Sequence, residues 1–319
     1  MRSRSIQAVL RTRLPFRVTR PSRPVSSRGV PSKSRAACGP YGVVSAGGKN
    51  VIRLFAPDES RSWVFPILFE DDHYIALDKM SHMAVTHTQL FPDRPSLLQL
   101  IQHAVGSGAR WVAKRNTAHF SFAYRIDFET SGITLFCKSN EACQKIGNLL
   151  GANEGRREFY CLVHGIPKED SFEIDAKIGW VPGRPEIMQA GKRGKQSRTQ
   201  FEVVERFAGM TLLKCLPDTD RKHQIRAHLQ YVGMPLVGDA FYGGHLLLLS
   251  KIKRNYRPRR DGMEQPLLDR AALHYSRLSF THPIKSEPVN IESPLAKDIQ
   301  VALKYLRKYA PLRVLSQSE

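Results

Sequence analysis

The sequence predicts a mixed α+β domain, and three observations lead to that class. Short runs rich in β-branched and aromatic residues alternate with a few segments of helical periodicity. No internal repeat with a period of roughly 20 to 50 residues is present, which argues against solenoids and propellers. Apolar residues make up 41% of the 319 positions, which is enough for a sizeable core. We therefore expect one folded domain.

The expected strands are short apolar runs bounded by turn residues. They cover residues 73–78, 123–127, 133–138, 158–164, 199–204 and 210–216. Thr130, Ser131 and Gly132 predict a turn between the second and third strands. Ala208 and Gly209 connect the last two, which predicts a β-hairpin.

The expected helices carry apolar residues at intervals of three and four positions. They cover residues 96–105, 141–150, 223–231 and 296–309. Pro95 lies near the start of the first helix, and Ser139 or Asn140 is the expected cap of the second. Gly233 suits a left-handed conformation that ends the third helix.

Positive charge is concentrated near the N-terminus. The chain has 49 Lys and Arg against 29 Asp and Glu, and this net charge of +20 predicts a polyanionic partner. Residues 1–57 hold ten Arg, two Lys and no acidic residue, together with many Ser and Pro. We expect them to form a disordered basic tail, with the folded domain at residues 58–319. A transit peptide for a mitochondrion or plastid, an RNA-binding arm and a misplaced start codon all fit this tail.

The short apolar runs and the cysteine spacing argue against a membrane-spanning protein and against one built on disulfides or a thiolate metal site. The longest conspicuous apolar run, residues 246–249, is far shorter than the roughly 18 residues that cross a bilayer. The five cysteines are odd in number and no two have C-x-x-C spacing, so neither a disulfide framework nor a thiolate metal site is predicted. This cysteine usage favours a reducing compartment, and we expect a cytoplasmic protein.

Asp127 stands out in the first segment suited to chemistry. Residues 124–132 place this acid at the end of an apolar strand, followed by Thr, Ser and Gly. Taken alone, the segment is better explained as an ordinary turn, because an Asp at a strand end commonly accepts hydrogen bonds from its own loop.

The second segment, residues 219–228, is a basic helix start. Arg221, Gln224 and His228 fall near one another on a helix, whereas Arg226 points elsewhere. A solvated helix face is the alternative interpretation. The two histidines of the segment are five positions apart and therefore splay, so we expect no metal site.

Taken together and in this order, these segments resemble the RluA family of RNA pseudouridine synthases. The family motif H-R-L-D-x-x-T-S-G corresponds to residues 124–132, R-x-H-Q-I-R-x-H to 221–228, and G-x-P-x-x-G-D-x-x-Y-G to 233–243. The motif K-x-Y-x-x-x-V-x-G matches residues 157–165, and further matches fall at 70–79, 195–199 and 273–283. The similarity covers about residues 65–295. It implies a mixed, largely antiparallel central sheet with flanking helices and a basic cleft.

The resemblance also implies an activity and roles for individual residues. The reaction converts uridine to pseudouridine in RNA and needs no cofactor. Asp127 corresponds to the essential carboxylate, which attacks the sugar or base or removes a sugar proton. Arg226 matches the arginine that pairs with this acid, and Tyr160 matches the active-site tyrosine. Arg125 matches the side chain that fills the gap left by the flipped nucleotide.

Structural interpretations remain open for two of these residues. Tyr160 could be a strand residue with a core-facing ring, and Arg125 could form a surface ion pair. Their positions in the matched motifs favour the functional interpretation.

Other residues are expected to bind the substrate. Arg221 and Ile225 belong to the second motif, and Lys195 belongs to a basic cluster at residues 192–198. A second cluster, residues 251–260, surrounds Tyr256 with cations that include Arg254 and Arg257. Cations around an aromatic ring suit phosphate tracking with some base stacking, although such a run is often only a solvated surface.

The chain departs from the family pattern at several positions. Tyr124 replaces the usual His, Ile126 replaces Leu, and Met80 with Ser81 replaces a Pro-containing pair. Asp220 stands where the family has Gly, which places a side chain and a negative charge at a turn near the RNA. We expect substrate preference to be the property most affected.

The sequence therefore predicts an isomerase acting on specific uridines of structured RNA, with ribosomal RNA favoured over transfer RNA. No obligate protein partner is evident. The alternative is a noncatalytic RNA-binding or ribosome-assembly protein that retained the fold. Asp127, Tyr160 and Arg226 argue against that alternative.

Overall fold

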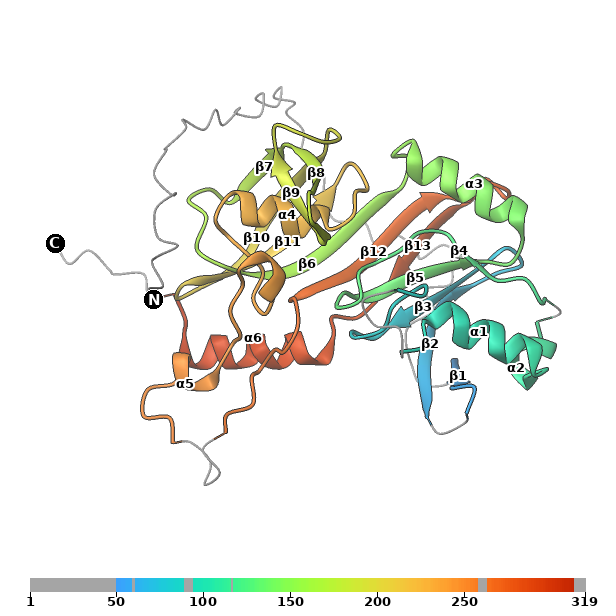
Figure 1. Cartoon of the computed structure of the whole chain (residues 1–319), viewed down its shortest axis with the longest axis horizontal. Coiled ribbons are helices and arrows are strands. Elements are labelled where there is room, and N and C mark those ends of the chain that lie inside the picture. The colour runs from blue at the N-terminus through green and yellow to red at the C-terminus, as the bar shows by residue number, and fades with distance from the viewer. Residues whose placement is uncertain (1–49, 59–60, 89–93, 116, 258–262, 313–319) are drawn as a thin grey trace, which may run out of the picture. The chain divides into compact units, whose positions relative to one another are not determined.

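The computed structural model describes residues 50–58, 61–88, 94–115, 117–257 and 263–312. Their strands form a sheet of eleven strands and a separate two-stranded sheet. The main path of the large sheet runs through β1 (Val51–Phe55), β2 (Ser62–Glu70), β3 (Tyr74–Lys79), β5 (Ser131–Cys137), β12 (Leu273–Thr281), β6 (Arg156–His164), β11 (Met210–Pro217), β10 (Arg198–Phe207) and β7 (Ser171–Asp175) (Figure 1).

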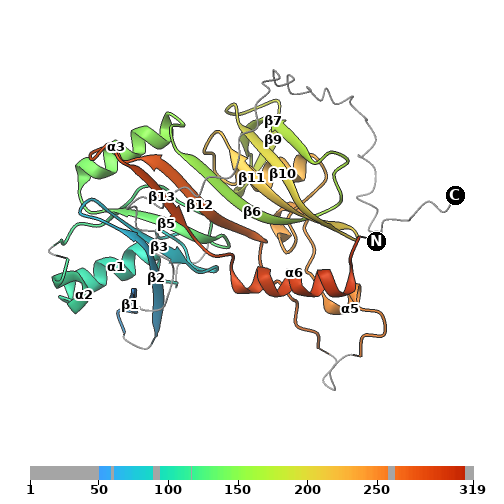
Figure 2. The same ribbon diagram turned by 180° about the vertical axis from the view of Figure 1, so that it is seen from behind.

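Two further strands pair beside this path: β4 (Ser121–Phe122) with β5, and β13 (Pro288–Glu292) with β12. The ladders of the described strands are antiparallel except that between β5 and β12. β12 lies between β5 and β6 (Figure 2). It therefore joins an N-terminal half of the sheet to a C-terminal half, and the predicted mixed, largely antiparallel sheet is confirmed.

Helices cover both faces of each half and bury four apolar clusters. The helices are α1 (Leu97–Gly106) and α3 (Asn140–Gly151) on the N-terminal half, and α4 (Gln224–Tyr231) and α6 (Lys297–Tyr309) on the C-terminal half. Alternation along a strand sends successive side chains to opposite clusters. Ile75 and Leu77 of β3 pack in the α1 cluster, whereas Tyr74 and Ala76 pack in the α3 cluster.

Local capping explains where the predicted helices begin and end. Ser96 caps α1 in a capping box with Gln99, and Ser139 caps α3 by accepting a hydrogen bond from the backbone N–H of Ala142. Gly233 follows α4 with a positive φ of 77°, as expected for a left-handed helix end. These helix predictions are confirmed.

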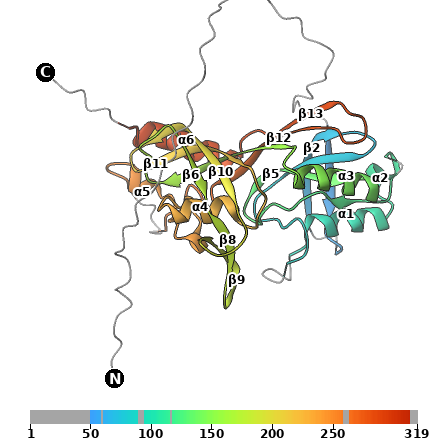
Figure 3. The ribbon, with the colours of Figure 1, turned by 90° about the horizontal axis from the view of Figure 1, so that it is seen from above.

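The remaining elements are short. They are α2 (Arg110–Ala113), η1 (Ala240–Tyr242), α5 (Leu249–Ile252), and the hairpin of β8 (Lys177–Val181) with β9 (Arg184–Gly191). The hairpin projects away from the large sheet (Figure 3). Among the described residues, no helix is long and apolar enough to cross a membrane.

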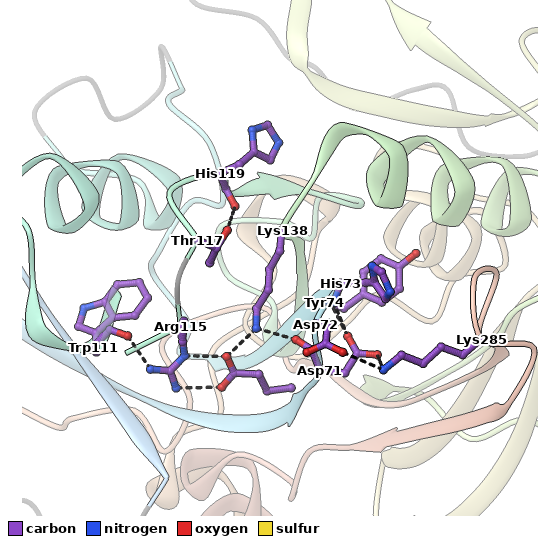
Figure 4. Close-up of polar contacts among 11 residues, drawn as sticks. Asp71, Asp72, His73, Tyr74, Trp111, Arg115, Thr117, His119, Lys138 and Lys285 are labelled. Carbon is purple, nitrogen blue, oxygen red and sulfur yellow. Dashed lines mark hydrogen bonds and ion pairs between the residues drawn. The ribbon is translucent and has the colours of Figure 1, made fainter. Parts of the chain in front are cut away.

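A polar network ties the β2–β3 turn to distant segments (Figure 4). Glu70 accepts two hydrogen bonds from the Arg115 guanidinium, at 2.6 and 2.8 Å, and one from Lys138 Nζ at 2.8 Å. Lys138 Nζ also donates to the Asp71 carbonyl, and Asp71 Oδ2 lies 3.4 Å from Lys285 Nζ. The network fixes one end of the N-terminal half by charge-assisted bonds.

The expected start of the folded domain at residue 58 is wrong. Residues 51–55 form β1, which pairs along its whole length with β2. Ile52 and Leu54 are buried against α1, while Val51 and Phe55 are exposed. The alternation of a half-buried edge strand was obscured by the charge of the surrounding segment. The rest of the predicted tail, residues 1–49, lies outside the described residues.

The expected strand at residues 123–127 is also wrong. Ladder pairing with β5 stops at Phe122, and only the backbone N–H of Ala123 still reaches the Leu135 carbonyl. Tyr124 and Ile126 are instead partly buried against the apolar clusters. Side-chain packing thus satisfies the apolar pattern without a strand.

We predict that Leu54→Ala lowers the free energy of unfolding by about 2–5 kcal/mol, because it removes a fully buried side chain from β1. Val51→Ala is the matched control, since Val51 lies on the same strand with its side chain exposed. Urea denaturation measures both variants. Equal, small losses would show that β1 does not belong to the stable core.

Candidate active site

A cleft of about 600 Å³ lies where the two halves of the sheet meet. Its lining comes from residues 84–88, 122–128, 130, 157, 159, 217, 219–226, 273 and 275. The lining includes five Arg or Lys side chains and two Asp, so the cleft is net positive. Such a surface suits a polyanion.

Asp127 projects from the loop between β4 and β5. Its carbonyl accepts a hydrogen bond from the Thr130 backbone N–H at 3.1 Å, which closes a turn over residues 127–130. Ser131 and Gly132, which were predicted to belong to the turn, already lie in β5. Gly132 follows with a φ of 106°, and a Cβ there would lie 2.2 Å from the Tyr275 carbonyl oxygen of β12. A glycine is therefore required for β5 to pair with β12 directly behind the loop.

Arg270 forms hydrogen bonds with the loop that carries Asp127. This fully buried side chain donates to the Glu129 carbonyl at 3.0 Å and to Ser131 Oγ at 3.1 Å. Its Nε and Nη2 donate to the two carboxylate oxygens of Asp298, at 2.6 and 2.9 Å. Arg270 was not predicted, because a lone arginine before a strand carries no distinctive sequence signal.

Arg226 of α4 connects Asp127 to a second acid. Its Nη1 donates to Asp127 Oδ2 at 3.2 Å, while Nε and Nη2 donate to Asp239 at 2.7 and 2.8 Å. The guanidinium carbon also lies 4.7 Å from the centre of the Tyr242 ring. Asp239 is fully buried and follows Gly238, whose φ of 80° brings its backbone against that of Arg270. This bidentate pair fixes the orientation of Arg226.

The sequence correctly placed Arg226 beside Asp127, but it missed Asp239. The signal was a single acid in the apolar run from Leu236 to Phe241, inside the third matched motif. A buried acid in such a run needs a cationic partner.

His223 is a second neighbour of Asp127 that the sequence interpretation missed. It stands just before α4 with a positive φ of 55°, and its Nε2 lies 3.7 Å from Asp127 Oδ1. Its Nδ1 lies 2.8 Å from the Tyr242 hydroxyl. Among the described residues, no three His, Cys, Asp or Glu side chains gather closely enough to hold a metal ion.

Asp127 is held as a carboxylate. Burial by itself raises the pKa of Asp127, but His223, Arg226 and Lys79 outweigh burial and lower that pKa below its ordinary value. Burial lowers the pKa of His223 to about 4 despite the opposing effect of Asp127. His223 is therefore neutral at pH 7, and the cation that stabilises the carboxylate at that pH is chiefly Arg226.

Hydrogen bonds from its polar side chains fix α4 in place. Gln224 Nε2 donates to Thr199 Oγ1 at 2.9 Å, and His228 Nδ1 lies 3.0 Å from the same oxygen. Gln224 and His228 were expected near one another, with Arg226 elsewhere, and that geometry is confirmed. Arg221, expected beside them on the helix, instead precedes α4 and reaches Gln224 Oε1 through its backbone N–H. The basic helix is not a solvated face, because Gln224, Arg226 and His228 are all buried.

The other predicted site residues divide into two groups. Arg125, Arg221 and Ile225 line the cleft together with Asp127 and Arg226. Lys195, Arg254 and Arg257 are exposed and are not part of its lining.

Tyr160 is not brought to the cleft either. It is partly buried on the α6 face of β6, beside the cluster that contains Leu162. Phe159 points to the opposite face, lines the cleft and stacks on Tyr275 with ring centres 4.2 Å apart. Counting along K-x-Y from residue 157 also reaches Phe159, so the expectation for Tyr160 was one residue out of register.

Comparison with known proteins identifies the family. A sequence profile described as RNA pseudouridylate synthase matches residues 73–231. The chain is 32% identical over 243 residues to the uncharacterized RNA pseudouridine synthase YlyB of Bacillus subtilis, covering 76% of this chain and 73% of the relative. It belongs to the RluA family of RNA pseudouridine synthases. Members of this family are isomerases that act on uridine in RNA.

A further relative supports the assignment to this family, and a solved structure shares the fold. Ribosomal large subunit pseudouridine synthase C of Escherichia coli is 32% identical over 249 residues, covering 76% of this chain and 70% of the relative. The solved structure of human RNA pseudouridylate synthase domain containing 4 has the same fold, with a TM-score of 0.55 and 18% identity. That match covers 76% of this chain and 92% of the human one.

We predict that Asp239→Asn lowers the free energy of unfolding by about 3–5 kcal/mol, because it leaves the buried Arg226 without its bidentate partner. Asp170→Asn breaks an ion pair with Arg206 of similar length, 2.7 Å, but Asp170 is 89% exposed. That control should cost far less, since exposed pairs contribute little. Chemical denaturation of both variants measures the difference, and equal losses would contradict the role of Asp239 as the buried partner of Arg226.

Proposed function

We propose that the protein converts specific uridines of ribosomal RNA to pseudouridine, with Asp127 as the catalytic carboxylate. The observation that carries this proposal is the ionised Asp127, paired with Arg226 inside a positively charged cleft. The name of the Escherichia coli relative supports ribosomal RNA as the substrate. Transfer RNA is the second candidate. For the compartment, the cytoplasm remains our proposal, and the four described cysteines are all free.

In the reaction, the bond from N1 of uracil to C1′ of the ribose breaks and a bond from C5 to C1′ forms. One proton leaves C5 and one is gained at N1, so no redox partner is needed. Asp127 acts as a nucleophile toward the sugar or base, or it removes a sugar proton. Arg226 keeps the carboxylate charged and oriented in each of these routes.

The base has to leave the RNA stack before it can reach Asp127. Arg125 is exposed at the cleft and lies two residues before Asp127. We propose that its guanidinium fills the gap left by the displaced nucleotide, because a planar cation can stack on bases and reach phosphates. Phe159, rather than Tyr160, offers the ring face on which the uracil can lie.

Cations outside the cleft extend the proposed RNA surface. Arg254 and Arg257 follow α5 and are exposed, as is Lys195 beyond the β8–β9 hairpin. Phosphate contacts of this kind add affinity without selecting a base.

The decisive experiment is Asp127→Asn. Asn keeps the size of the side chain but cannot act as nucleophile or base, so pseudouridine formation in a single turnover should fall by several orders of magnitude. Binding of the same ribosomal RNA should stay within about tenfold, a margin of roughly 1.4 kcal/mol. Mapping of pseudouridine in cellular RNA with and without the gene identifies the substrate. Near-normal turnover of the variant would refute the catalytic role of Asp127.

A second experiment tests the outer surface. Arg254→Gln with Arg257→Gln should weaken RNA binding and lower the slope of log affinity against log salt by about 0.9 for each phosphate that the variant no longer neutralises. The single-turnover rate at saturating RNA should change little, because these contacts position the RNA without taking part in bond breaking. An unchanged salt slope would remove this surface from the binding site.

A further inference from the structure

Three arginine side chains of the described chain are buried, and one of them is held differently from the other two. Arg226 and Arg270 each form a bidentate pair with one carboxylate, at distances of 2.6 to 2.9 Å. Arg157 of β6 is only 5% exposed, yet its guanidinium has a single ion pair at 3.3 Å, from Nη1 to Asp220 Oδ2. Its Nε is buried and makes no hydrogen bond within the described residues.

The partner of Arg157 is itself poorly placed to neutralise it. The Asp220 side chain is 57% exposed, so water competes for its carboxylate. A buried guanidinium needs charge and hydrogen-bond partners to offset its desolvation. With one long contact and one unpaired nitrogen, Arg157 retains unused capacity to bind an anion.

That capacity lies inside the cleft. Arg157 and Phe159 are two positions apart on β6, so both side chains point to the cleft face, where Asp127 and Asp220 also lie. Tyr275 lies close enough for both charges of the pair to affect its phenol: Arg157 favours and Asp220 opposes its ionisation, although burial dominates and raises the pKa of Tyr275. The Arg157–Asp220 pair therefore lies beside the Phe159 and Tyr275 rings that line the cleft.

We propose that Arg157 binds a phosphate group of the RNA, and that Asp220 occupies Arg157 in the free protein until the phosphate displaces it. The proposal rests on the proposed RNA substrate. A phosphate presents two oxygens to the fork of a guanidinium, so it can bind Nη1 and Nη2 together, whereas Asp220 makes a single contact to Nη1. Asp220, on the exposed turn before α4, can move into solvent at little cost.

This exchange gives the departure at position 220 a physical role. The Asp220 carboxylate lowers the affinity for any RNA that does not place a phosphate at Arg157. Correctly bound RNA recovers this binding free energy, because the pair of Arg157 with a phosphate is stronger than its pair with Asp220. Asp220 is thus a specificity-determining residue, acting against incorrectly seated RNA.

The test is a double-mutant cycle between Arg157→Gln and Asp220→Asn. The probe is an in vitro transcript of a ribosomal RNA hairpin with uridines in its loop, and its affinity is measured over a range of salt. Asp220→Asn alone should tighten binding by about three- to tenfold while lowering thermal stability, because it frees a buried cation. Arg157→Gln should weaken binding and lower the salt slope by about 0.9. In the Arg157→Gln background, Asp220→Asn should change affinity less than about twofold.

Asp218→Asn is the matched control. Asp218 lies on the same loop and also forms a 3.3 Å pair, with Arg198 Nε, but it is not part of the cleft lining. It reports the effect of removing any nearby negative charge. If Asp220→Asn tightens binding no more than Asp218→Asn does, the proposal is wrong. This comparison leaves the buried Arg157 unchanged, so it does not depend on the folding of the Arg157→Gln variant.

Two other outcomes overturn the proposal. If Asp220→Asn raises RNA affinity equally in the Arg157→Gln background, Asp220 acts only by repelling phosphates and not by occupying Arg157. Loss of affinity in Arg157→Gln with an unchanged salt slope would indicate a contact to a base. Pseudouridine formation by the unmodified protein on the same transcript is assayed separately, so failure of the proposed activity is distinguishable from failure of this exchange.

Discussion

The site depends on one buried guanidinium, that of Arg226, shared between two carboxylates. Asp239 receives two short bonds and sets the orientation of the arginine, and Asp127 receives the remaining nitrogen. Asp239, which is fully buried, thus orients the arginine, whereas Asp127, which lines the cleft, keeps its charge there. Because Asp127 comes from the N-terminal half of the sheet and Arg226 from the C-terminal half, the same interaction connects the two halves across the cleft.

Much of this arrangement could be predicted from the chain alone. The helices were predictable because their caps and apolar spacing act locally, as Ser96 and Ser139 illustrate. Asp127 and Arg226 were predictable from motifs with fixed spacing. The assignment of Tyr160 was wrong because it lies one residue beyond the position that the K-x-Y motif gives, and one residue along β6 exchanges the two faces of the strand.

The remaining errors have a common cause in tertiary contacts. β1 was assigned to the tail because the surrounding charge outweighed a short alternating pattern, and only pairing with β2 reveals it. Residues 123–127 have the apolar pattern of a strand but pack without a ladder. Arg270 and Asp239 act through partners distant in sequence, such as Asp298 and Arg226, and no local pattern encodes such pairs.

The place of β12 in the sheet has a consequence for folding. Ser131 and His274, neighbours across the parallel ladder, are 143 residues apart in the chain. β12 therefore enters between β5 and β6 as a nearly final strand, and closing so long a loop is slow compared with forming local hairpins. Until β12 is in place, the loop that carries Asp127 lacks the Tyr275 backbone against which Gly132 packs. A ribosome would thus have to synthesise most of the chain before Asp127 could be set in position, so an incomplete chain would have no assembled site.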